Sequence, residues 1–260
     1  MDHSGRHSLA VVIPTVGRNS LVRAARSVFQ QKISLKIHLL IGVDVDLGRQ
    51  VNTLRDQIER EKPSNFTLTW LDVGYSTSRR HGGQHACNFG GAIRSVLTFL
   101  ADARYVMYLD DDDWLHEEHA KDILKAIQDV SWAHSLCFYA NSDTCEILEV
   151  DELESVGVYK GIYANKFGGF VRPSGLTIDK LKLLHLTHLW SCSAFPTGDG
   201  EDRLMFSALM SQPHRSTNRA TVFHSLDPRD SMHTERLRFL ASKGRTSVTV
   251  TKNETVRSEI

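Results

Sequence analysis

The chain has 260 residues, of which 41% are hydrophobic and 24% charged, a composition typical of a globular protein with one sizeable domain. Lys plus Arg and Asp plus Glu both total 31, so the formal net charge is zero and the basic excess of a nucleic-acid-binding surface is absent. These totals argue against a nucleic-acid partner, but they leave room for a local field that binds a small anion.

The first half of the chain alternates strand-like with helix-like segments. Four apolar runs have the character of buried strands and cover residues 8–13, 36–43, 65–73 and 104–109. Apolar residues at helical spacing follow at 21–28, with Asn19 or Ser20 as the expected N-cap, and recur at 93–100 and 120–127. This alternation predicts an α/β fold with a Rossmann-like, mostly parallel central sheet and helices on both faces.

The second half is less regular. We expect two further strands, a glycine-containing loop and a helix, at residues 131–140, 145–150, 165–178 and 200–210 in turn. The segment after Gly244 is polar, with one short strand expected at 247–250. No internal repeat or long linker divides the chain, so we expect a single domain over residues 1–260.

Three polar loops follow predicted strands. They are "PTVGR" (14–18), "DVD" (44–46) and "DDDD" (110–113), after the first, second and fourth strands. In open parallel sheets, ligands bind outside the carboxyl ends of the strands, where the strand order reverses. We therefore expect these loops to converge on one crevice if the strands that carry them are neighbours.

The four consecutive aspartates need a counter-charge, because adjacent carboxylates repel one another. Carboxylate oxygens suit Mg²⁺ and Mn²⁺, and magnesium is usually held by one or two protein carboxylates together with water and substrate phosphates. Asp110 and Asp112 thus suggest a metal that bridges the protein to a phosphate-bearing substrate. The alternative is a solvated helix start, where the helix dipole favours Asp112 and Asp113. That alternative does not explain four aspartates after a buried strand.

Three motifs in order, "VVIPTVGR", "LDDDDWL" and "GEDRLMF", resemble the family-2 glycosyltransferases of the GT-A fold, from about Leu9 to about Ser231. The resemblance implies inverting transfer of a sugar from a nucleotide-diphosphate sugar, by default a UDP-sugar, to an acceptor hydroxyl, with Mn²⁺ or Mg²⁺ as cofactor. It also implies a GT-A domain with a nucleotide-sugar-binding half at about 1–115, a smaller acceptor and catalytic half at about 116–231, and a C-terminal tail at 232–260.

The resemblance assigns donor-side roles residue by residue. It makes Asp112 the metal-binding aspartate and places the ribose against Asp110 or Asp111. The first loop, which lies against the nucleotide, contributes Pro14, Thr15 and Arg18. The residue that meets the base is Asp44, with Asp46 as a competitor, because this chain reads "GVDVDLG" where the family usually has "DDGS".

One departure from the family pattern leaves open which cation contacts the diphosphate. "ACNFGGA" (86–92) resembles the family's A-R-N-x-G-x-x-x-A, but Cys87 stands where arginine is common. The nearby cations that compete for this role are Arg79, Arg80 and His81.

On the acceptor side, the resemblance makes Asp202 the catalytic base, with Glu201 beside it. The competing interpretation is a capping box with Asp199 as N-cap and Asp202 at N3, and the two roles are compatible. His224 matches a late histidine that can be a further metal ligand, although with thirteen histidines a structural role is equally open. Trp114 and Trp190 suit either sugar stacking or the core.

Two other functions use the same residues. The first is a nucleotide-sugar-binding subunit without transfer activity, and the second is a metal-dependent phosphohydrolase or nucleotidyltransferase. "PTVGRNS" is not the G-x-G-T-R loop of a sugar nucleotidyltransferase, and Trp114 breaks the haloacid-dehalogenase pattern D-x-D-x-[TV]. A cation site that only stabilises the fold is a further alternative, but it would not explain Asp202, so transfer is preferred.

Few features of the sequence indicate where the protein is located or whether it forms oligomers. The first apolar run stops at Pro14, too early for a signal-peptide core, and no run approaches the roughly 20 residues of a spanning helix. The four cysteines lack CxxC spacing, which favours reduced thiols. We expect a cytoplasmic protein, or one peripheral at a membrane, with no transmembrane segment. Homo-oligomerisation through the tail after Ser231 is an open alternative.

Overall fold

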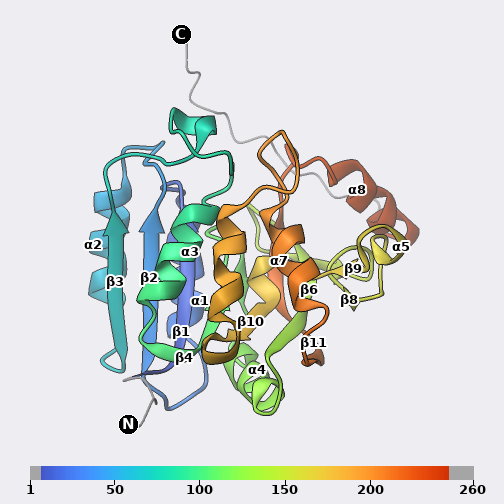
Figure 1. The fold of residues 1–260 in the computed structure, drawn as a ribbon, viewed down its shortest axis with the longest axis horizontal. Coiled ribbons are helices and arrows are strands. Elements are labelled where there is room, and N and C mark those ends of the chain that lie inside the picture. Colours follow the sequence, from blue (N-terminus) through green and yellow to red (C-terminus); the bar gives the residue numbers. More distant parts are fainter. Residues whose placement is uncertain (1–6, 246–260) are drawn as a thin grey trace.

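The computed structural model describes residues 7–245 as a mixed α/β fold around one large sheet (Figure 1). The first four strands are β1 (His7–Thr15), β2 (Ile37–Val43), β3 (Phe66–Asp72) and β4 (Ala103–Tyr108). They lie in the order β3-β2-β1-β4 and are parallel, so β1 is bonded to both β2 and β4 and the strand order reverses beside it. The predicted strands are confirmed, and the strands that carry the three polar loops are neighbours.

The sheet continues beyond β4 with strands from the second half of the chain. These are β10 (Leu176–Asp179), β6 (Trp132–Asn141), β11 (His214–Leu226) and β5 (Trp114–Leu115), with β7 (Ile147–Val150) paired to β6; β8 (Gly157–Val158) and β9 (Gly169–Phe170) form a separate ribbon. β10 is antiparallel to both of its neighbours and fully buried. The prediction of a loop over 165–178 is therefore wrong at its end, because a four-residue strand shows too little periodicity to be recognised.

Helices cover both faces of the sheet, as predicted. The longer ones are α1 (Ser20–Phe29), α2 (Val51–Glu61), α3 (Gly91–Leu100), α4 (His119–Ile127), α7 (Glu201–Leu209) and α8 (His233–Ser242). The shorter ones are α5 (Ala164–Phe167), α6 (Lys180–Leu183) and the 3₁₀ segments η1 (Arg79–His81), η2 (Pro173–Gly175) and η3 (Leu184–Ser191). α8 occupies part of the segment expected as a tail, and the strand expected at 247–250 lies outside the described residues. None of the helices within 7–245 is both long and apolar enough to span a bilayer.

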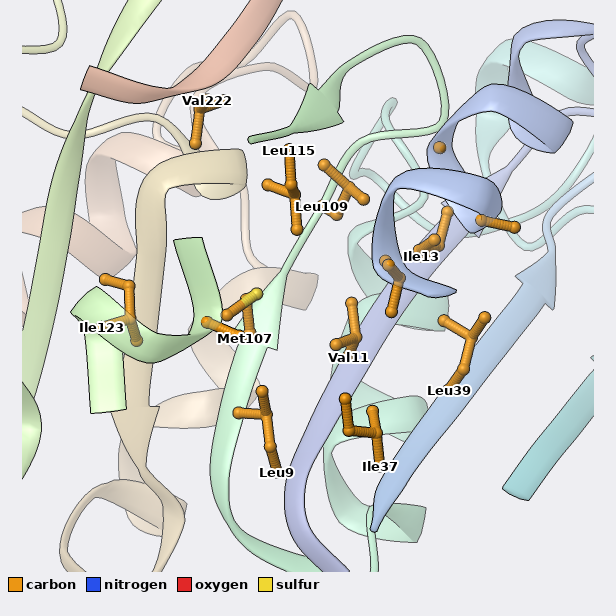
Figure 2. Packing of buried hydrophobic residues seen from close by; sticks show 14 of the residues in the cluster. Leu9, Val11, Ile13, Ile37, Leu39, Met107, Leu109, Leu115, Ile123 and Val222 are labelled. Atoms are coloured by element: carbon orange, nitrogen blue, oxygen red, sulfur yellow. The ribbon is translucent and has the colours of Figure 1, made fainter. Parts of the chain in front are cut away.

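The core lies in two layers, one on each side of β1. Leu9, Val11 and Ile13 pack with α1, α2 and α4 on one face (Figure 2), whereas Ala10 and Val12 pack with α3 and α7 on the other. Burial on both faces explains the continuous apolar run of β1. The rigid sheet fixes the carboxyl ends of β1, β2 and β4 along one edge, and the segment between β3 and α3 lies over that edge (Figure 1).

Candidate active site

The loop after β1 binds two of the four aspartates. Asp111 is buried and accepts hydrogen bonds from the Thr15 hydroxyl at 2.6 Å, the Val16 backbone N–H at 3.3 Å and Arg18 Nη1 at 2.7 Å. The same Nη1 donates to Asp112 Oδ2 at 2.8 Å. The pKa of the Arg18 guanidinium is raised, because the charges of Asp111 and Asp112 outweigh its burial. The predicted "PTVGR" loop therefore meets the aspartates directly.

Asp112 keeps 34% of its side chain exposed and shares its arginine partner with Asp111. Loss of hydration, followed by the like charges of Asp113, Asp111 and Asp110, raises the pKa of Asp112 to about 8 despite the opposing effect of Arg18. A divalent cation at this carboxylate would relieve that repulsion and favour the ionised form.

Asp113 is a buried anchor. It accepts hydrogen bonds from His224 Nδ1 and the Ser225 backbone N–H, both at 3.0 Å, and from the Ser174 hydroxyl at 2.5 Å. Burial alone would raise the pKa of Asp113, but His224, Arg172 and these hydrogen bonds lower it to about 2. Asp113 thus holds the His224 ring in place through Nδ1.

The hydrogen bonds of the His224 ring are those expected of a metal ligand. Nε2 of His224 is buried and has no hydrogen-bond partner in the part of the chain that the structure describes, while Nδ1 is bound to a carboxylate, which is the usual arrangement of a metal-ligating histidine. Within residues 7–245, no three His, Cys, Asp or Glu side chains are grouped closely enough to form a complete metal site. A cation held here would need oxygen ligands from a substrate diphosphate and water, as Mg²⁺ commonly does.

Asp44 and Asp46, at the end of β2, have different environments. Asp46 accepts hydrogen bonds from the backbone N–H groups of Gln50 and Val51, both at 3.1 Å, and so caps the start of α2. Asp44 is buried and, within the described residues 7–245, its side chain accepts one hydrogen bond, from the Ser76 hydroxyl at 3.0 Å. Gly17 has φ of 77°, and a Cβ there would lie 2.6 Å from Asp46 Oδ1, so glycine allows the first loop to lie against this aspartate.

Position 87 supplies no cation. Cys87 is a buried free thiol that lies 3.6 Å from the Trp190 carbonyl oxygen, and burial raises its pKa. Arg79, Arg80 and His81 form η1 in the segment over the carboxyl edge, where the Arg80 guanidinium lies 5.1 Å from the Phe89 ring centroid. Trp190 is 1% exposed and packs on Tyr108, so it belongs to the core, whereas Trp114 is half-buried and stacks on Phe223.

Glu201 and Asp202 open α7, but not through the expected capping box. The N-cap is Gly200 in the left-handed conformation, and the Asp199 side chain instead accepts a hydrogen bond from Asn88 at 3.1 Å. Asp202 accepts the Arg203 backbone N–H at 2.8 Å and keeps part of its side chain exposed. Burial raises the pKa of Asp202, and burial together with the Asp202 charge raises that of Glu201 to about 8.

The raised pKa of Glu201 predicts a pH dependence of stability. The unfolded chain loses this proton near its ordinary pKa of 4.5, whereas the folded chain keeps it to about pH 8, so the contribution of Glu201 to stability falls as pH rises between those values. Glu201→Gln should remove this contribution. The free energy of unfolding of the variant should therefore decline less steeply with rising pH than that of the wild type. Urea unfolding from pH 4.5 to pH 8 measures the difference, and parallel curves would contradict the assignment.

Arg94 connects the two acidic clusters and was missed in the sequence. It is buried in α3, donates from Nη2 to Asp110 Oδ1 at 2.7 Å, and places Nη1 3.8 Å from Glu201 Oε1. Burial opposes its charge, but Asp110 and Glu201 raise the pKa of the guanidinium. The available signal was an arginine beside Ile93 on the buried face of a predicted helix.

Comparison with known proteins identifies the fold class. No protein-family model matches the sequence, and no curated protein matches it. Among solved structures, S. aureus TarS is 15% identical over 91% of this chain, with a TM-score of 0.56. TarS 1-349 in complex with UDP-GlcNAc is 13% identical over 91% of this chain and 66% of that chain (TM-score 0.57). The mannosyltransferase PcManGT from Pyrobaculum calidifontis, in complex with GDP-Man and Mn²⁺, is 15% identical over 96% and 67% of the two chains (TM-score 0.57).

These similarities show a GT-A-like fold, as the sequence predicts. The present chain spans 39% of the TarS chain. At this level of identity the similarity concerns the fold alone, and the chemistry has to be argued from the site.

Proposed function

We propose that this protein is an inverting glycosyltransferase that moves a sugar from a nucleotide-diphosphate sugar to an acceptor hydroxyl. The observation that carries the proposal is the position of Arg94 between Asp110, at the end of β4, and Glu201, at the start of α7. Because one guanidinium reaches both, the aspartate cluster and the Glu201–Asp202 pair belong to one site at the switch point of the sheet.

The residues divide into donor-side and acceptor-side groups. Asp112 and His224 would hold a divalent metal on the diphosphate side of the site, and we assign the ribose to Asp110 or Asp111 and the base to Asp44. Pro14, Thr15 and Arg18 line the first loop beside the nucleotide. When bound, Mn²⁺ or Mg²⁺ supplies positive charge for the departing nucleoside diphosphate. Asp202 takes the proton of the acceptor hydroxyl, and direct attack on the anomeric carbon inverts its configuration.

The contrast between Asp44 and Asp46 gives a prediction. Asp46→Ala should lower the free energy of unfolding by about 1 kcal/mol because α2 loses its capping carboxylate. Nucleotide binding should change little. Asp44→Ala should instead weaken nucleotide binding, because the base loses its acceptor. Urea unfolding and calorimetric titration of nucleoside diphosphates separate the two effects. Loss of nucleotide binding in Asp46→Ala without a loss of stability would reverse the assignment.

The proposed function is tested by a donor screen. UDP-, GDP-, dTDP- and CDP-sugars, each with and without Mn²⁺, are added to the wild type in thermal unfolding, followed by assays of donor hydrolysis and transfer. A ligand that binds only the folded state raises its apparent stability. We expect metal-dependent stabilisation by one nucleotide class, and turnover of that donor. Stabilisation without turnover for any acceptor would favour a binding subunit, and no stabilisation by any donor would refute the proposal.

A further inference from the structure

Arg94 has unused donors on the side of Glu201. Its Nη2 is bound to Asp110, but Nη1 and Nε are buried and have no hydrogen-bond partner among residues 7–245. The 3.8 Å between Nη1 and Glu201 Oε1 is too long for a hydrogen bond. Buried donors without partners are unfavourable, so shortening this distance by less than 1 Å would stabilise the site.

Arg94 itself is firmly held. Its guanidinium carbon lies 4.8 Å from the ring centroid of Trp190, which packs against Tyr108 with ring centroids 4.9 Å apart. Asp110 fixes the other end of the guanidinium. Because Arg94 is held by β4 and η3, closing the gap would draw Glu201, and with it the first turn of α7, toward Arg94.

We propose that Arg94 is a positioning residue that couples donor binding to the placement of the catalytic base. It orients Asp110 for the donor and, by completing a hydrogen bond to Glu201 in the complex, sets the position of the adjacent Asp202. This inference rests on the proposed glycosyl transfer. Misplacement of a reacting group by about 1 Å can lower a rate about 100-fold, so the contact acts on turnover more than on donor affinity.

Arg94→Lys is the informative variant. It keeps the positive charge, but a single ammonium cannot reproduce the fork that faces two carboxylates. We expect its kcat to fall by about 10- to 100-fold, while the Kd for the nucleoside diphosphate with Mn²⁺ changes by less than about 3-fold. Arg104→Lys is the matched control, because Arg104 pairs with the buried Asp179 at 2.8 Å near the start of β4, at the opposite end of that strand from Asp110. Its kcat should equal that of the wild type.

A double-mutant cycle with Glu201→Ala separates positioning from charge neutralisation. If Arg94 acts through Glu201, the losses in kcat of Arg94→Lys and Glu201→Ala are less than additive. If Arg94 is purely structural, Arg94→Lys will lower the melting temperature and leave kcat per folded molecule unchanged. Either that result or additive losses in kcat would overturn the inference. Absence of transfer by the wild type would refute the proposed function instead.

Discussion

Replacing Asp112 with asparagine should abolish metal-dependent donor binding and leave the fold intact. The amide keeps the shape of the side chain but removes the charge that a divalent cation requires. Stabilisation by a nucleoside diphosphate with Mn²⁺ should disappear, and the transfer rate should fall by at least about 100-fold. Thermal unfolding and initial rates on the same preparations measure both effects.

The melting temperature of Asp112→Asn without metal distinguishes a loss of metal binding from misfolding. Because burial and neighbouring carboxylates raise the pKa of Asp112 to about 8, ionisation of this group destabilises the metal-free protein. Asp112→Asn should therefore melt at or above the wild-type temperature at pH 8 without metal. Asp122→Asn is a matched control on α4, where Asp122 pairs with Arg219 at 2.6 Å away from the site. Wild-type metal dependence in Asp112→Asn would exclude Asp112 as a ligand.

The fold was largely predictable from sequence where segments are long and buried on both faces. The runs that became β1 and β2 are apolar at nearly every position, because helices cover both sides of these strands. β11 was missed, since its first half is mostly exposed and polar and only its second half is buried. α2 was missed for a similar reason: its buried face consists of only Val51, Leu54 and Ile58.

The candidate site could be predicted where its residues are adjacent in the sequence. The repulsion among four adjacent aspartates indicates a site, and in the structure Arg18 is shared by Asp111 and Asp112 while Asp110 and Asp113 have partners of their own. Those partners come from distant segments, such as Thr15 for Asp111 and His224 for Asp113, so no local pattern reveals them. Arg94 shows the same limit, because its role depends on Asp110 and Glu201 meeting in space.

Asp202→Asn should leave donor binding unchanged and lower the transfer rate by about 10²- to 10⁴-fold, the range typical of a lost general base. The asparagine oxygen can still accept the Arg203 N–H, so the start of α7 should remain intact. Burial raises the pKa of Asp202, and a base must be ionised to act, so the wild-type rate should rise with pH through this titration. The residual rate of Asp202→Asn should lack that rise.

Glu201→Gln is the matched control, because the two carboxyl groups are adjacent and only one can be the base. With a pKa raised to about 8, Glu201 is mostly protonated at neutral pH and is a poor proton acceptor there. The glutamine variant should therefore keep most of the transfer rate and the wild-type pH profile, while its oxygen can still meet Arg94. If Glu201→Gln loses the rate and Asp202→Asn keeps it, the base is Glu201, and Arg94 then faces the catalytic residue itself.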